Sequence, residues 1–122
     1  MERASEPLKG YWSLPGGLVE TGEKLEAAIA REVREETSLR VKPAQMFEIF
    51  ERIMRDSRGR AEYHYVLVDY VCKVVGGRLR AADDVSRAEW VRRVDLGDYL
   101  VTEGTAAVIG RAFDARRKRT RI

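Results

Sequence analysis

The stretch from Gly17 to Leu39, GLVETGEKLEAAIAREVREETSL, decides the fold. At about 100° per residue, its apolar residues form an i, i+4, i+8 stripe that predicts one face of an α-helix. Glu32 and Glu36 project into the same arc as this stripe. The pattern therefore places carboxylates where a helix normally buries apolar side chains. The stripe consists of Leu25, Ile29 and Val33.

The carboxylates of Glu32, Glu35 and Glu36 are spaced i, i+3 and i+4 on the predicted helix. Like charges at this spacing repel one another, and an ionised carboxylate in a low-dielectric site is costly unless a cation compensates it. One carboxylate could simply pair with an arginine. A bound divalent cation best resolves the conflict among all three, so the stretch predicts a metal site.

Length and composition bound the class of protein. The chain of 122 residues predicts one domain that covers residues 1–122. With 44% hydrophobic and 35% charged residues, it reads as a soluble globular chain, and no apolar run approaches the ~20 residues of a membrane span. The single cysteine, Cys72, excludes a disulfide framework, and residues 1–10 show no secretory signal. We therefore expect a cytoplasmic protein with no membrane partner.

The net charge of +3 is concentrated at the C-terminal end of the chain. A basic end can contact nucleic acid, but no aromatic side chain lies among these charges to stack on bases. We therefore expect a solvated helix end, and nucleic acid is not the expected partner. The basic residues are Arg116, Arg117, Lys118, Arg119 and Arg121.

The predicted helix begins near Thr21 or Gly22, where a threonine is available as N-cap and Glu23 falls in the first turn. It ends at about Thr37, because β-branched Val41 and then a proline break the helical pattern.

Segments rich in aromatic and β-branched residues, 45–55 and 62–75, predict an antiparallel pair joined by a turn at 56–60. An acidic loop at 81–86 and a strand at 88–92 follow. A last helix is expected from about Glu103, with Thr102 as N-cap and an apolar face of Ile109, Ala112 and Phe113.

With Gly17, Glu23, the run 31–36 and Leu39 at these spacings, the chain resembles the Nudix hydrolases, whose signature has this order. Residues around the signature extend the resemblance over nearly the whole chain. One position departs, because the family usually has Gly where this chain has Ser38, and that Gly ends the helix with positive φ. We expect Ser38 to strain the helix exit by ~1 kcal/mol without touching a ligand.

The resemblance implies an α/β (α+β) fold, a Nudix-like α/β/α sandwich with a mixed central sheet. Nudix domains normally begin with a strand that leads directly into the position of residues 2–4, and that strand is missing here. We expect a sheet without its first strand, with Met1 as a misassigned start, a truncation, or the edge of a gap filled by another subunit. An exposed edge invites pairing, so a homodimer is compatible with the sequence.

Carried over position by position, the resemblance implies that Glu32, Glu35 and Glu36 bind Mg²⁺ or Mn²⁺, with the backbone carbonyl of Gly16 as a further ligand. Hard oxygen ligands suit these cations and argue against zinc or copper. Arg31 would orient and neutralise the cluster, which is compatible with an ordinary i, i+4 pair to Glu35.

In the implied reaction, water attacks one phosphorus of a diphosphate bridge, and the metal neutralises charge and acidifies water. We expect catalytic roles for Glu32, Glu35 and Arg31. The general base is either a helix glutamate or a carboxylate on a later loop. Asp84 is the loop candidate for base or extra ligand, and a solvent-facing turn residue is the alternative.

Trp12 and Tyr65 are candidates for substrate binding, because aromatic faces stack on purines without demanding a particular one. Core packing is the more common role of such residues. His64 alternates with tyrosines on a predicted strand, and we expect it to be structural.

Residues 62–70 and 100–105 resemble a bacterial Nudix subgroup usually labelled ADP-ribose pyrophosphatase. We therefore expect cleavage of a nucleoside diphosphate linked to another moiety, with ADP-ribose giving AMP and ribose 5-phosphate. One alternative is a pyrophosphohydrolase that acts on an oxidised or ordinary nucleoside triphosphate. Another is a non-catalytic Nudix module that binds a nucleotide or nucleic acid, which loss of signature carboxylates would favour; none is lost.

Overall fold

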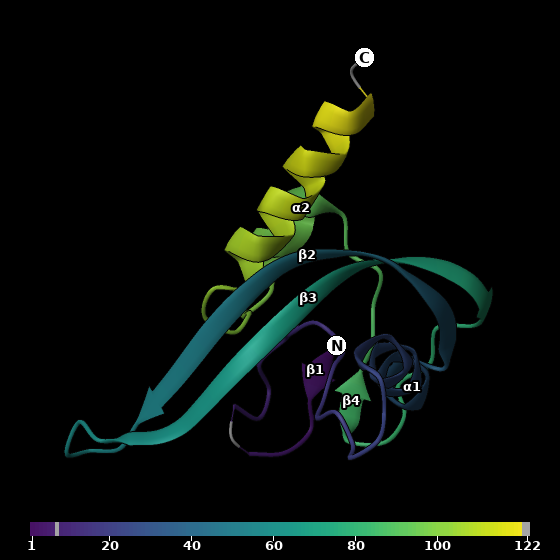
Figure 1. Ribbon diagram of the computed structural model, residues 1–122. Helices are drawn as coiled ribbons and strands as arrows, with labels where there is room; N and C mark the ends of the chain where they lie inside the picture. The colour runs from purple at the N-terminus through teal and green to yellow at the C-terminus, as the bar shows by residue number, and fades with distance from the viewer. Residues whose placement is uncertain (7, 121–122) are drawn as a thin grey trace.

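The computed structural model describes residues 1–6 and 8–120, with side chains described as far as Ala115 (Figure 1). It has the expected mixed α+β class, with helices on antiparallel strands. No helix in this part of the chain is long and apolar enough to cross a membrane. The basic end predicted to be solvated lies outside the described side chains. The elements are β1 Glu2–Arg3, α1 Leu25–Thr37, β2 Leu39–Arg55, β3 Ala61–Gly77, β4 Val85–Arg87, the 3-10 helix η1 Arg93–Asp98 and α2 Thr105–Thr120.

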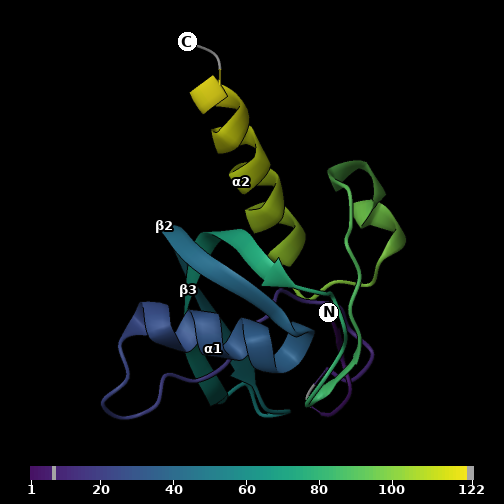
Figure 2. The same ribbon diagram turned by 90° about the vertical axis from the view of Figure 1, so that its right-hand side faces the viewer.

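The strands β2 and β3 form a long antiparallel ribbon, which confirms the predicted pair. Pairing begins directly after α1, with Leu39 opposite Gly77, and Phe50 lies opposite Leu67 further along. Helix α2 lies on one side of the ribbon, and α1 lies on the other side with β1 and β4 (Figures 1 and 2). The ribbon is therefore the layer between the helices.

The remaining strands form a second, small sheet in which β1 pairs antiparallel with β4. Trp12 connects this sheet to the segment before α2, because it bridges Glu2 on one side and Val101 on the other. The strands expected in one mixed sheet therefore form separate antiparallel pairs. The strand predicted at 88–92 is wrong: β4 occupies Val85–Arg87, and its partner β1 is too short to pair with the residues that follow.

Both helices begin later than predicted, for the same reason. Gly22 and Gly104 have φ of +84° and +82°, which exclude them from a right-handed helix. Helix α1 therefore starts after Lys24, which makes no side-chain cap, and the predicted threonine N-cap is wrong. Before α2, the Thr102 and Thr105 hydroxyls hydrogen-bond at 2.5 Å, so Thr102 still supports the helix start.

The end of α1 is as predicted. The helix stops at Thr37, and Ser38 adopts the left-handed conformation with φ of 64°, where its N–H donates to the Arg34 carbonyl at 2.9 Å. The Ser38 hydroxyl donates to the carbonyl of Arg80 at 3.2 Å, which partly offsets the strain. The buried apolar side chains gather around this end of the fold and under α2: Ala28, Leu39, Val85 and Val108.

Candidate active site

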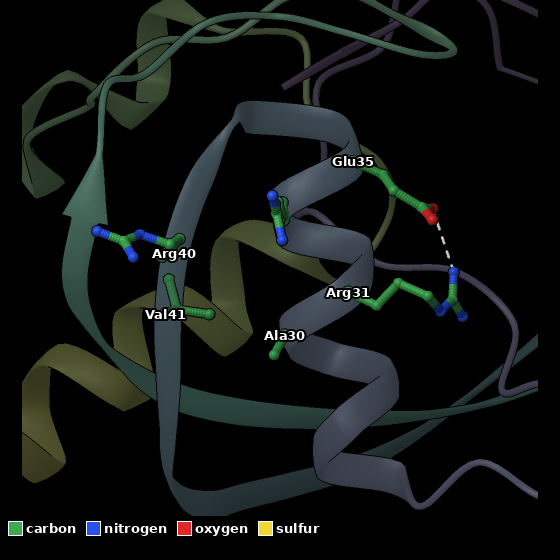
Figure 3. Close-up of a pocket in the computed structure, with 6 residues that line it drawn as sticks. Ala30, Arg31, Glu35, Arg40 and Val41 are labelled. Atoms are coloured by element: carbon green, nitrogen blue, oxygen red, sulfur yellow. Dashed lines mark hydrogen bonds and ion pairs between the residues drawn. The ribbon is translucent and has the colours of Figure 1, made fainter.

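Arg31 holds the carboxylates of α1 together. Its Nε donates to Glu23 at 2.7 Å, and its Nη1 donates to Glu32 at 2.9 Å. The same Nη1 donates to Glu35 at 3.1 Å, as Figure 3 shows. Its Nη2 donates to the carbonyl of Leu18 at 3.1 Å, which ties the loop before the helix. The hydrogen bonds to Glu23 and Glu32 raise the pKa of Arg31 further above its ordinary range. The bond from Arg31 in turn lowers the pKa of Glu23. Arg31 is therefore charged at any pH that matters for activity.

Glu36 differs from its neighbours because it is buried and has no arginine in contact. It exposes 7% of its surface, and its Oε1 accepts a hydrogen bond from the backbone N–H of Gly16 at 2.7 Å. Burial raises the pKa of Glu36 to about 7, with repulsion from Glu32 and Asp83 acting in the same direction and the Gly16 hydrogen bond and the N-terminal ammonium of Met1 opposing it. The positive charge that acts on Glu36 therefore comes from the chain terminus and is outweighed by burial and by the neighbouring carboxylates.

The glycine turn before α1 passes directly over these carboxylates. A Cβ at Gly17 would lie 2.5 Å from the carboxylate of Glu32, whereas a Cβ at Gly16 would meet nothing within 4 Å. Gly17 is thus required by the close approach of the backbone to Glu32. The turn at Gly16 and Gly17 therefore lies against Glu32 and Glu36 of α1, and a metal-binding role for the Gly16 carbonyl stays a prediction.

The two adjacent acids of the later loop have different surroundings, and the role predicted for Asp84 stays a prediction. Asp84 accepts a hydrogen bond from the Ser5 hydroxyl at 2.5 Å, so its carboxylate is engaged with the N-terminal segment. Asp83 is the neighbour whose charge acts on Glu36. Asp83 has φ of 54°, and the loop is held by a hydrogen bond of 3.1 Å from the Ala82 N–H to the Glu36 carbonyl. The sequence signal was the adjacent acidic pair, which does not say which of the two exposed carboxylates acts on Glu36.

The aromatic candidates are held by other side chains. Trp12 packs edge-on against Tyr99, with ring centroids 5.0 Å apart, and the Arg87 guanidinium lies 5.8 Å from its ring. Tyr65 on β3 stacks on Tyr63 with centroids 6.0 Å apart. These contacts stabilise the fold, and base stacking by either ring stays a prediction.

A shallow hollow of about 590 Å³ lies beside the cluster, between α1 and the start of β2 (Figure 3). Ala30 and Val41 form its apolar part. Its charged lining contains more arginine than glutamate: Arg31, Arg34, Arg40 and Glu35.

The carboxylate oxygens of Glu32, Glu35 and Glu36 are of the kind that binds a hard divalent cation. Among the residues described, no three Asp, Glu, His or Cys side chains lie close enough together to hold an ion. Arg31 bonds to one oxygen of Glu32, and Gly16 bonds to one oxygen of Glu36, so each carboxylate keeps a second oxygen. A bound cation would favour the ionised form of buried Glu36, and these oxygens suit Mg²⁺ or Mn²⁺.

Comparison with known proteins identifies the family. The family model described as NUDIX domain matches residues 1–111. The chain belongs to the NUDIX family. A crystal structure of a MutT NUDIX hydrolase from Burkholderia pseudomallei has the same fold, with a TM-score of 0.71, 26% identity, and coverage of 89% of this chain and 82% of that one.

The relatives of this NUDIX domain are named for different activities. The chain is similar to an ADP-ribose pyrophosphatase of Methanocaldococcus jannaschii, with 39% identity over 90 residues, 74% of this chain and 51% of the relative. It is also similar to the mouse 8-oxo-dGDP phosphatase NUDT18, with 30% identity over 100 residues, 79% of this chain and 28% of the relative. The chain thus spans about half the length of the first relative and less of the second.

Proposed function

We propose that this NUDIX domain hydrolyses the diphosphate bond of a nucleoside diphosphate linked to another moiety. A Mg²⁺ or Mn²⁺ ion would be held by Glu32, Glu35, Glu36 and the backbone carbonyl of Gly16. The single observation that carries the proposal is the buried carboxylate of Glu36, which has a second carboxylate beside it and a raised pKa. Such an arrangement is costly for folding alone, and a bound cation compensates it.

Each side chain of the site has a distinct part in the proposed reaction. When bound, the ion neutralises charge on the diphosphate and acidifies the attacking water. Arg31 fixes Glu32 and Glu35 through its guanidinium, and Glu23 anchors Arg31 from outside the helix. Glu35 uses only Oε2 in its 3.1 Å hydrogen bond to Arg31, so its Oε1 could bind an ion. Glu32 or Glu35 is then available to take the proton of the water.

The substrate is an anion with two phosphate groups, and the hollow beside the cluster supports this. Arg34 and Arg40 line it together with Arg31, so its charged lining favours phosphate oxygens. ADP-ribose, cleaved to AMP and ribose 5-phosphate, is the proposed substrate, supported by the similarity to the M. jannaschii enzyme. Such nucleotides arise inside cells, so we place the domain in the cytoplasm.

A second candidate is a nucleoside triphosphate pyrophosphohydrolase, supported by the similarity to the nucleoside triphosphatase NudI of Escherichia coli. Product analysis separates the two, because ADP-ribose cleavage releases no inorganic pyrophosphate. Release of pyrophosphate as the main product, with ADP-ribose untouched, would replace the first candidate by the second.

The test is a nucleotide panel with Mg²⁺ and the substitution Glu36→Gln. A neutral amide cannot hold the metal charge, so we expect turnover to fall at least ~10²-fold. Glu26→Gln, an exposed carboxylate in the first turn of the same helix, is the matched control and should retain the parent rate. Equal rates in parent and Glu36→Gln would refute the mechanism. Binding of a nucleotide without turnover in the parent would instead favour the non-catalytic module.

The adjacent acids of the later loop provide a second test. If the loop carboxylate serves as base or ligand through Asp84, Asp84→Asn should reduce turnover more than Asp83→Asn. The electrostatic contact to Glu36 gives the reverse order, with Asp83→Asn having the larger effect. Rates of both variants across a Mg²⁺ titration distinguish the two assignments.

A further inference from the structure

The segment between β3 and β4 lies against the C-terminal end of α1, and we call it the connecting loop, residues 78–84. The Arg80 N–H donates to the Thr37 carbonyl at 2.8 Å. Further along the loop, the Ala82 N–H donates to the Glu36 carbonyl at 3.1 Å. These carbonyls belong to the last turn of the helix, where they have no partner within the helix itself. The connecting loop therefore satisfies the end of α1 through two backbone hydrogen bonds.

Ser38 adds a side-chain hydrogen bond to the same contact. Its hydroxyl donates to the Arg80 carbonyl at 3.2 Å, so the N–H and the carbonyl of Arg80 are both bound at the helix exit. Ser38 makes this bond from the left-handed conformation, with φ of 64°. A Cβ is disfavoured there, and glycine adopts the same backbone without that cost. The hydroxyl is therefore what serine adds at this position and glycine would not.

Asp83 is the residue of the connecting loop that this contact brings to the candidate active site. It directly follows Ala82, whose N–H is bound to the Glu36 carbonyl, and its charge acts on the Glu36 carboxylate. Asp83 is also left-handed, with φ of 54°. Of the three non-glycine residues with positive φ in the described chain, two thus lie at this one contact. Such residues persist only where surrounding contacts fix them, and they cluster at functional sites.

We propose that Ser38 is a positioning residue, which holds the connecting loop against α1 and thereby keeps the Asp83 carboxylate near Glu36. The inference rests on the proposed function, in which Glu36 binds the divalent ion. A further negative charge close to a cation strengthens its binding, because Coulomb attraction increases as the distance decreases. The Ser38 hydroxyl bonds to the connecting loop and not to a carboxylate of the cluster, so it acts through the loop.

The first test is the amide hydrogen exchange of Arg80 and Ala82 with a chelator present, which depends neither on activity nor on a bound ion. Ser38→Gly keeps the backbone conformation and removes the hydroxyl. We expect both amides to exchange about fivefold faster, the effect of losing one hydrogen bond. Ser38→Asn tolerates the left-handed conformation and retains a donor, so it should keep the exchange rates of the parent. Ser57→Ala is the matched control, because Ser57 is an exposed serine of the hairpin turn whose hydroxyl has no partner among the described residues.

The second test is the binding of Mn²⁺ alone, measured by the EPR signal of the free ion. Ser38→Gly should weaken binding about fivefold without lowering the thermal midpoint, because glycine relieves the strain while the connecting loop loosens. Ser38→Asn should bind Mn²⁺ as the parent does. In the background of Asp83→Asn, Ser38→Gly should weaken binding no further, because both substitutions act through one carboxylate.

Each measurement has an outcome that would overturn the positioning role. Equal exchange rates in parent and Ser38→Gly would show that the hydroxyl does not hold the loop. Faster exchange with unchanged Mn²⁺ affinity would leave Ser38 as a structural cap of α1. Additive losses of affinity in the double variant would show that Ser38 does not act through Asp83. A parent that binds no Mn²⁺ and turns over no nucleotide would refute the proposed function, whereas the exchange rates report the loop contact on their own.

Discussion

Glu36 on α1 and Val66 on the ribbon occupy each other's usual environments. The carboxylate is 7% exposed and the valine 62% exposed, although burial normally excludes charge and favours valine. In both regions, a side chain lies in an environment that is unfavourable for it in the isolated chain. The buried carboxylate has no arginine bonded to it among the described residues, and the exposed valine side chain lacks apolar cover. The following experiments test whether the carboxylate region is as tightly constrained as this contrast requires.

The largest effect is expected where the backbone touches the carboxylates. Gly17→Ala places a methyl group 2.5 Å from the Glu32 carboxylate, so Glu32 must move, and we expect turnover to fall ~10²-fold. Gly16→Ala is the matched control, because its Cβ meets nothing within 4 Å and its carbonyl is retained. Steady-state rates with Mg²⁺ measure both. Similar rates for the two variants would mean that Glu32 does not need its present position.

A second experiment uses the pH dependence of stability with metal removed by a chelator. The pKa of Glu36 is raised from 4.5 to about 7 in the folded state, so the folded chain binds more protons than the unfolded chain between these values. The contribution of Glu36 to the free energy of unfolding should therefore be fully present below pH 4.5. It should fall as the pH rises to 7, by roughly 3 kcal/mol at most. Glu36→Gln should remove this slope.

Adding Mg²⁺ sharpens the same measurement, because the ion favours the ionised carboxylate and should restore stability at pH 7. Chemical denaturation at several pH values provides the free energies of unfolding. A parent chain whose chelated stability rises from pH 4.5 to 7 with the same slope as Glu36→Gln would show that Glu36 is not the strained group.

A smaller effect is expected at the exit of α1. Ser38 has φ of 64°, so Ser38→Gly should relieve strain and stabilise the chain by about 0.5–1 kcal/mol, less the lost bond to the Arg80 carbonyl. Gly77→Ala nearby should have the opposite sign, because φ is +84° and a Cβ would lie 2.5 Å from the Ser38 carbonyl oxygen. Thermal midpoints of the two variants report both signs.

The smallest effect is expected from the basic end. Truncation after Ala115 removes the clustered arginines and lysine but leaves Arg111 and its bonds to Glu48. Hydrolysis should stay within about twofold of the parent, because every side chain of the carboxylate cluster is retained and salt screens the loss of surface charge. A collapse of activity in the truncated chain would give the basic end a role in substrate binding.

Much of the carboxylate region could be predicted from the sequence, because helical spacing alone brings Glu32, Glu35 and Glu36 to one turn. The ribbon could also be predicted from its β-branched and aromatic residues. Helix starts could not, since they depend on positive φ at Gly22 and Gly104, which a sequence does not display. Local propensity gives even less information on long-range choices.

The strand expected around Trp90 shows this limit. Its residues suit a strand, but strand formation needs a partner, and β1 offers one only as far as Arg87. The choice between Asp83 and Asp84 depends in the same way on loop geometry, because Ser5 engages one and leaves the other near Glu36. The metal and catalytic assignments stay predictions until the variants above are measured.

The backbone of Trp12 joins the N-terminal segment to the segment that leads into α2. Its backbone N–H donates to the Leu100 carbonyl at 2.8 Å, and its carbonyl accepts from Thr102 at 2.9 Å, so the start of the chain and the approach to α2 are fastened at one residue. Gly16, which bonds to Glu36, follows only four positions later. A displacement of the segment before α2 therefore has a short path along the chain, through Trp12, to the glycine turn that bonds to Glu36.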